Sequence, residues 1–209
     1  MPASPEPPTG ILPATAENIR RAADAVRAGE LVVIPTETVY GVAARADSPA
    51  ALARLYAAKG RDESKRMALF ADGIGSVRAA GVRVDEIAER LAAAFWPGPL
   101  TMVLETATGG WNGFRVPDHP VALAWLRELR GVVPAVTSAN RSGEPPAPTA
   151  QEAWAALAPH VSLALDAGPV AGGVPSTVVK VGPEGVEILR AGVLSGEAIA
   201  KAAGCPVKG

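Results

Sequence analysis

The chain has 209 residues, with 20 lysines and arginines against 21 aspartates and glutamates, so its formal net charge is −1. A hydrophobic fraction of 48% with 20% charged residues is typical of a globular protein and excludes wholesale disorder. The near-neutral charge argues against a protein that coats nucleic acid through its overall field, although a local basic groove remains open. The single cysteine, Cys205, excludes an internal disulfide framework and a zinc site built from cysteines, which favours a cytoplasmic protein.

The chain shows no membrane segment and no signal peptide. No stretch approaches the roughly 18 consecutive apolar residues that a membrane span requires. Residues 1–10 contain no Lys or Arg and no apolar run, so we expect a flexible leader there. No repeat and no linker interrupts the remainder, and residues 11–209 are therefore expected to form one domain.

The first half of the chain alternates helices with strands. Helical spacing of apolar residues predicts a helix over 11–29, and the apolar run 31–34, ended by Pro35, predicts a buried strand. Ser48 and Pro49 are typical of a helix start, and this helix should end at Gly60. The other elements expected in this half are strands at 39–44, 67–71 and 100–104 and a helix at 85–95.

The second half continues the alternation and ends in a hairpin. Strands are expected at 177–181 and 186–189, joined by a loop with two glycines and a proline. The other expected elements are helices at 121–129, 150–157 and 196–203 and strands at 132–136 and 161–165. Alternating helices and strands with a terminal hairpin predict an α/β fold around a mixed sheet.

Several common catalytic signatures are absent from the sequence. It has no phosphate loop of the G-x-x-x-x-G-K-[ST] type, no G-x-G-x-x-G fingerprint and no G-x-S-x-G elbow. His119 precedes a helix and His160 follows one, so we interpret both as capping or surface residues. An enzyme with this inventory would work mostly by positioning and electrostatics.

Two polar segments could form an anion site. Lys59 and Arg61, with Lys65 and Arg66 just beyond, place four cations after a helix, which suits a polyphosphate; helix capping and solvation are the plain alternative. Residues 137–143, from Thr137 through Ser138 and Asn140 to Gly143, follow an apolar strand, where α/β proteins bind ligands; an ordinary turn would look similar.

Further polar residues stand at other strand ends. Thr36, Glu37 and Thr38 follow the strand at 31–34, and a glycine-rich approach leads to Ser176. Arg115 and Arg190 follow apolar residues in strand-like stretches, so each needs an acidic partner or an anionic ligand. Each signal alone is weak, but together they are typical of the polar lining of an anion-binding cleft.

At these residues the sequence resembles the threonylcarbamoyl-AMP synthase (YrdC-like) family, over about residues 12–195. Six ordered motifs carry the resemblance: Pro35-Thr36-Glu37-Thr38-Val39-Tyr40-Gly41, Lys59-Gly60-Arg61, Trp96-Pro97-Gly98-Pro99-Leu100-Thr101, Arg115-Val116-Pro117-Asp118-His119-Pro120, Thr137-Ser138-Ala139-Asn140 and Ser176-Thr177-Val178-Val179. The resemblance implies a single-domain twisted mixed sheet with flanking helices and a positively charged cleft.

The resemblance also implies an activity. Family members convert L-threonine, bicarbonate and ATP into threonylcarbamoyl-AMP and pyrophosphate, for the N6-threonylcarbamoyl group of tRNA position 37. Mg²⁺ would accompany ATP, and a tRNA threonylcarbamoyl-transferase complex would act downstream, with tRNA bound only weakly or indirectly by this chain. Two alternatives stay open: a double-stranded RNA or ribosome-binding module on the same fold, and a carbamoyltransferase that handles a carbamoyl adenylate.

The resemblance further implies roles for individual residues. Lys59 and Arg61 would be catalytic, and the threonine amine would be the nucleophile. The ATP-binding set is Lys59, Arg61, Lys65, Ser138, Asn140 and Arg190, and the threonine-binding set is Thr36, Thr38, Thr101, Arg115, Thr137 and Ser176. The ligands of the metal stay open, although Glu37 or Asp47 could serve it through water.

The chain departs from the family pattern after Arg61. Many members have two prolines in this loop, whereas residues 62–67 of this chain contain no proline. Lys65 occupies a position that is Asn or Lys in the family. Phe70 stands where some members have a histidine that touches threonine. We therefore expect the loop to hold its ligands in its own way.

Overall fold

The computed structural model describes residues 10–170 and 173–209, and eleven strands of this part form one sheet. The strands are β1 (Gly10–Pro13), β2 (Val32–Ile34), β3 (Gly41–Arg45), β4 (Ala68–Phe70), β5 (Leu100–Glu105), β6 (Trp111–Arg115), β7 (Pro134–Ser138), β8 (Leu163–Asp166), β9 (Thr177–Gly182), β10 (Gly185–Arg190) and β11 (Val207–Lys208). The helices are α1 (Ala16–Arg27), α2 (Pro49–Lys59), α3 (Ile74–Ala79), α4 (Glu86–Phe95), α5 (Pro120–Glu128), α6 (Ala150–Leu157) and α7 (Gly196–Ala203).

The order of strands in the sheet is β1-β8-β2-β3-β7-β4-β6-β5-β9-β10-β11. Parallel pairs such as β5–β9 occur beside antiparallel pairs such as β3–β7 and β9–β10. The mixed α/β sheet predicted from the sequence, with its terminal hairpin, is therefore confirmed. Residues 1–9 of the predicted leader lie outside the described residues, and Gly10 already belongs to β1.

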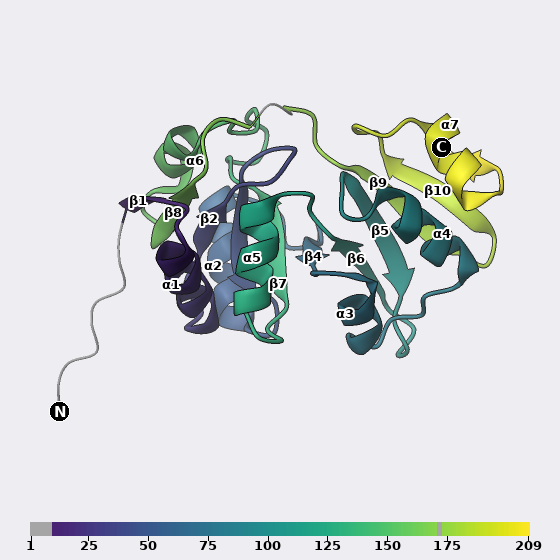
Figure 1. The fold of residues 1–209 in the computed structure, drawn as a ribbon, viewed down its shortest axis with the longest axis horizontal. Helices are drawn as coiled ribbons and strands as arrows, with labels where there is room; N and C mark the ends of the chain where they lie inside the picture. The colour runs from purple at the N-terminus through teal and green to yellow at the C-terminus, as the bar shows by residue number, and fades with distance from the viewer. Residues whose placement is uncertain (1–9, 171–172) are drawn as a thin grey trace.

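Three apolar clusters fix the helices to the sheet. In the half that holds β1, β8, β2 and β3, α1 and α5 pack on one face, and α2 and α6 pack on the other. In the other half, α3, α4 and α7 pack against β5, β6, β9 and β10. Figure 1 shows these halves on the left and right, with β4 and β6 between them.

The alternation of side chains along β5 shows which face of the second half is left for a site. Met102 and Leu104 are buried in the cluster with α4 and α7. The alternate residues Thr101 and Val103 point to the opposite face, because successive residues of a strand alternate, and both line the cavity described below. This opposite face of the central strands carries the cavity described below.

The helix ends place two polar segments. The Ser48 side chain caps α2 by accepting from the Ala51 N–H, and Pro49 begins the helix, as predicted. Gly60 ends α2 in the left-handed region, with φ 57°, which turns the chain sharply between Lys59 and Arg61. His119 caps α5, and His160 is exposed, so the interpretation of both histidines is confirmed.

Some elements differ from the prediction. Residues 10–13, expected to begin the first helix, instead form β1, which pairs in parallel with β8. The short α3, the strand β6 and the two-residue β11 were not predicted as elements. No helix among the described residues has the length and apolar character needed to cross a membrane.

Candidate functional site

A cavity of about 820 Å³ opens on the exposed face of the central strands. Its lining contains at least one residue of each of the six motifs. The predicted site residues that line it are Thr36, Thr38, Arg61, Thr101, Arg115, Thr137, Ser138, Ser176 and Arg190. Lys59, Lys65 and Asn140 are not among its lining residues.

Strand pairing brings these residues together from distant parts of the sequence. Thr36 and Thr38 lie in the connection from β2 to β3, and Gly41 at the start of β3 pairs with Ser138 at the end of β7. A Cβ atom at Gly41 would lie 2.9 Å from the Val136 side chain, so this close approach requires glycine. The loop hydroxyls therefore lie beside the carboxyl end of β7.

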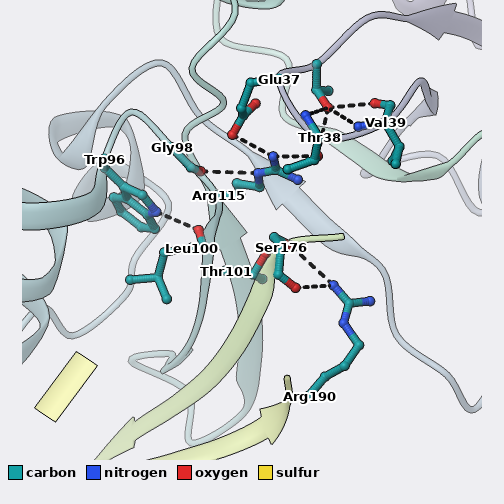
Figure 2. Close-up of polar contacts among 11 residues, drawn as sticks. Glu37, Thr38, Val39, Trp96, Gly98, Leu100, Thr101, Arg115, Ser176 and Arg190 are labelled. Atoms are coloured by element: carbon teal, nitrogen blue, oxygen red, sulfur yellow. Dashed lines mark hydrogen bonds and ion pairs between the residues drawn. The ribbon is translucent and has the colours of Figure 1, made fainter. Parts of the chain in front are cut away.

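Arg115 is the most constrained cation of the cavity (Figure 2). It is 5% exposed, and its Nη2 donates to Glu37 Oε1 at 2.7 Å and to Thr38 Oγ1 at 2.9 Å. Its Nε donates to the Gly98 carbonyl at 3.3 Å, and its Cζ lies 5.6 Å from the centre of the Phe70 ring. The described residues give its Nη1 no hydrogen-bond partner, so one edge of the guanidinium is available to a ligand.

A hydroxyl pair and a second arginine form another group in the cavity. Thr101 Oγ1 and Ser176 Oγ lie 2.9 Å apart, between the parallel strands β5 and β9. Arg190 Nη2 donates to the Ser176 carbonyl at 2.7 Å and to its hydroxyl at 3.2 Å (Figure 2). Burial lowers the pKa of Arg190, and the charges of Arg115 and Arg61 lower it further. Arg190 therefore lies close enough to Arg115 and Arg61 to be repelled by both.

Lys59 lies behind the cavity wall. Its Nζ donates to the carbonyl oxygens of Ser138 and Asn140, both at 2.5 Å, and it is 2% exposed. Burial and the charge of Arg61 lower its pKa to about 8. An ammonium has three N–H groups, so the lysine fixes the end of β7 and retains one donor.

Asn140 shapes the loop that follows β7. Its Nδ2 donates to the carbonyl oxygens of Arg141 and Glu144, at 2.9 and 2.8 Å. Its Oδ1 is buried without a hydrogen-bond partner among the described residues. The Ser142 N–H donates back to the Lys59 carbonyl at 2.9 Å, which closes the loop against the end of α2.

Arg61 and its loop form the wall beyond α2. Arg61 Nε donates to the Lys65 carbonyl at 3.1 Å, and its Nη2 donates to the Arg66 carbonyl at 3.3 Å. Lys65 is exposed, and its hydrogen bonds in the described part are made by its backbone: the carbonyl accepts from Arg61, and the N–H donates to the Asp62 carbonyl at 3.1 Å. Arg66, which was noticed in the cation cluster but left out of the predicted site, lines the cavity.

The described residues contain no group of three or more His, Cys, Asp or Glu side chains that could hold a metal ion. Arg61, Arg66, Arg115 and Arg190 line the cavity, and none of its lining residues is acidic. Glu37 lies just behind it, with Oε2 buried and unpartnered in the described part. A divalent cation would therefore have to arrive with its own anionic ligands, such as phosphates.

Comparisons with known proteins agree with this geometry. The Sua5_yciO_yrdC family model, described as telomere recombination, matches residues 24–192. The chain belongs to this family. A Mycobacterium tuberculosis relative is 38% identical over 192 residues, which cover 88% of each chain. The threonylcarbamoyl-AMP synthase of Bacillus subtilis is 35% identical over 87% of this chain and 55% of its own length.

Solved structures of the Sua5/YciO/YrdC family share the fold. P. abyssi Sua5 complexed with L-threonine superposes with a TM-score of 0.86 at 31% identity, over 95% of this chain and 62% of that chain. E. coli YciO superposes with a TM-score of 0.80 at 23% identity, over 91% and 98%, which shows the common fold. The YrdC-like fold expected from the motifs is therefore confirmed.

Sequence reasoning missed two contributors to the cavity and left a third undecided. Phe70 was noted only as a departure from the family, yet it lies against Arg115. Arg66 had a signal in the run of cations, but the sequence does not tell which of them turn toward the cavity. Glu37 was considered as a polar group of the cleft or a water-mediated metal partner; its ion pair with Arg115 was not predicted, because it joins residues 78 positions apart.

Proposed function

We propose that this chain is a threonylcarbamoyl-AMP synthase, which converts L-threonine, bicarbonate and ATP into threonylcarbamoyl-AMP and pyrophosphate. The product serves the N6-threonylcarbamoyladenosine modification of tRNA position 37, through a separate transferase complex. The observation that carries the proposal is that residues of all six family motifs line one cavity. The 38% identity to a relative of similar length supports it.

ATP occupies the part of the cavity near Arg61, Arg190 and Ser138. Four arginines in the lining, without an acidic lining residue in the described part, favour a positively charged cleft. Burial is the main cause of the lowered pKa of Arg190, and the charges of Arg115 and Arg61 add to it; a bound polyphosphate would offset that repulsion. Lys59 does not line the cavity, but it fixes the Ser138 end of this part by donating to the carbonyl oxygens of Ser138 and Asn140.

L-Threonine occupies the part near Arg115. The open Nη1 edge of this guanidinium receives the substrate carboxylate, because a planar fork matches the two carboxylate oxygens. Thr38, Thr101 and Ser176 are the hydroxyls next to it that can bond the substrate's polar groups. Thr36 acts indirectly, since its hydroxyl donates to the Val39 carbonyl at 2.6 Å and accepts from the Thr38 N–H.

The reaction needs no nucleophile from the protein. Bicarbonate takes up a proton and loses water to give CO₂; the threonine amine attacks this CO₂, forms a C–N bond and loses a proton to give a carbamate. A carbamate oxygen then attacks the α-phosphorus of ATP, and the bond to the β-phosphate breaks, so that pyrophosphate leaves with the electron pair. Arg61 and Arg190 stabilise the charge that develops on the phosphates.

Mg²⁺ fits this site only as a partner of ATP. It usually keeps several waters and binds through substrate phosphates with few protein carboxylates. The donor set around the cavity agrees with that mode, since its described lining offers hydroxyls and arginines rather than carboxylates. When bound, the ion would neutralise negative charge on the phosphates of ATP.

The test is pyrophosphate release from ATP and bicarbonate, with threonine, serine and other amino acids supplied in turn. We expect release that requires both bicarbonate and threonine. Release with another amino acid would show that this amino acid, rather than threonine, is the substrate, and Phe70 would be the first residue to examine. Absence of release with every amino acid, in a preparation that binds ATP, would contradict the proposal.

A further inference from the structure

We propose that Arg66 is a positioning residue, which straps the loop 61–67 to the start of β6 and thereby holds Arg61 at the cavity. The inference rests on the proposed function only for the identity of the ligand. It assigns a role to a residue that was left out of the predicted site.

The strap is a pair of hydrogen bonds between distant segments. Arg66 Nη1 donates to the Trp111 carbonyl at 2.6 Å and to Asn112 Oδ1 at 3.2 Å. Arg66 and Trp111 both line the cavity. The side chain therefore joins the loop after α2 to the first residues of β6 at the wall of the cavity.

The backbone at the anchored end of this loop receives Arg61. The carbonyl oxygens of Lys65 and Arg66 accept from Arg61 Nε and Nη2, and the Lys65 carbonyl also accepts from the Tyr56 hydroxyl at 3.3 Å. These bonds use two of the five N–H groups of the guanidinium and leave the others for a ligand. Movement of residues 65 and 66 would therefore move Arg61.

Local structure in the loop cannot replace the strap. Its first turn is closed by Asp62, whose carbonyl accepts from the Lys65 N–H at 3.1 Å and whose Oδ1 accepts from the Ser64 N–H at 2.8 Å. These bonds stay within residues 62–65, and residues 62–66 are exposed. Such a segment opens easily unless a contact ties it to the sheet.

The distinctive consequence concerns ATP rather than threonine. Arg61 belongs to the phosphate part of the cavity, whereas Arg115 in the threonine part is held by Glu37, Thr38 and Gly98. Loss of the strap should therefore raise the KM for ATP and leave the KM for threonine unchanged. A role in general stability would move both constants together or neither.

The experiment compares Arg66→Met, Asn112→Ala and the control Arg83→Met. Arg66→Met removes both hydrogen bonds and keeps an aliphatic stem, whereas Asn112→Ala removes one acceptor without changing the charge. Arg83 bonds Glu105 on the surface outside the cavity lining, so its variant makes the same charge change there. Hydrogen exchange at 61–67 and the two KM values are measured for each.

We expect Arg66→Met to speed amide exchange at 61–67 and to raise the KM for ATP roughly three- to tenfold, as loss of a net hydrogen bond or two implies. Asn112→Ala should change both in the same direction by less, and Arg83→Met should change neither. The proposal would be overturned if amide exchange at 61–67 is unchanged in Arg66→Met. It would also be overturned if Arg66→Met raises the KM for ATP while Asn112→Ala changes neither exchange nor KM. If the natural protein releases no pyrophosphate, the proposed function fails. The hydrogen-exchange measurement does not depend on activity, so it still tests whether Arg66 holds the loop.

Discussion

At the scale of single residues, Arg115 shows how this protein holds a buried cation ready for a ligand. Glu37, Thr38 and Gly98 fix three of its N–H groups, and the Phe70 ring lies 5.6 Å from its Cζ. An aromatic face attracts a guanidinium, whereas a protonated histidine at this position would repel it. Phe70 therefore stabilises the orientation of Arg115 and gives the cavity an apolar wall beside it.

Arg115→Lys tests this receptor. Lysine keeps the charge but loses the planar fork, so it cannot bond Glu37, Thr38, Gly98 and a carboxylate together. We expect the KM for threonine to rise roughly 10- to 100-fold, as loss of charge-assisted hydrogen bonds implies. The KM for ATP should change less than threefold; an equal rise in both constants would contradict the assignment of Arg115 to threonine.

The lowered pKa of Lys59 leads us to expect that nucleotide binding depends on pH. Its pKa of about 8 means that the free enzyme loses this charge as the pH rises through that value. A bound polyphosphate favours the ammonium, so the bound state keeps the proton to higher pH. Affinity for a non-hydrolysable ATP analogue should be full below about pH 8 and fall by up to about tenfold per unit above it.

The matched variant for this pH prediction is Lys59→Arg. Arginine stays charged over the whole range, so its binding curve should be flat, whatever its absolute affinity. Isothermal titration calorimetry between about pH 7 and about pH 9 avoids the terminal phosphate, which titrates near pH 6. Parallel curves for the natural protein and Lys59→Arg would remove Lys59 from the electrostatics of the site.

The sequence predicted the kinds of residue at the site but not their partners. Thr38, Ser138 and Ser176 stand out because small hydroxyl residues follow apolar strands. The ion pair of Glu37 with Arg115 and the bonds from Lys59 to the loop carbonyls depend on which strands become neighbours. No spacing along the chain contains that information.

At the scale of elements, β5 separates stability from function along one strand. Met102→Ala should lower the free energy of unfolding by about 2–5 kcal/mol, because it opens a hole in the cluster with α4 and α7. Thr101→Val should keep stability within about 1 kcal/mol, since Ser176 is the one partner of this hydroxyl among the described residues. In turn, Thr101→Val should raise the KM for threonine and Met102→Ala should not.

Denaturant unfolding and steady-state kinetics on the same preparations check this pair. The opposite pattern, with a stable Met102→Ala and an unstable Thr101→Val, would mean that the faces of β5 are assigned the wrong way round. Equal loss of stability in both variants would mean that the cavity face is packed like the core.

Elements were predictable where local signals agree with the final packing. Helix α2 carries its cap, its first-turn proline and its terminal glycine in the sequence, and its bounds came out within a residue. The start of the first helix was wrong, because Ile11 and Leu12 pair with β8, a strand about 150 residues later. α3 and β11 are too short for a periodic pattern to indicate them.

At the scale of the whole molecule, the strand order creates the site. Three apolar clusters attach helices to the two halves of the sheet, and the central strands β7, β4, β6 and β5 keep one face for the cavity. The sequence predicted a mixed sheet, but it did not predict that β4 and β6 join the halves. That topology depends on long-range pairing, and it is what brings the six motifs together.

The most direct test of the central claim follows the carbon of bicarbonate. The protein is incubated with ATP, Mg²⁺, L-threonine and isotopically labelled bicarbonate. The products are then separated and identified by mass spectrometry. We predict one labelled product that contains both threonine and AMP, formed in equal amount with pyrophosphate. AMP and pyrophosphate without a labelled adduct, or a labelled adduct that forms without threonine, would contradict the account.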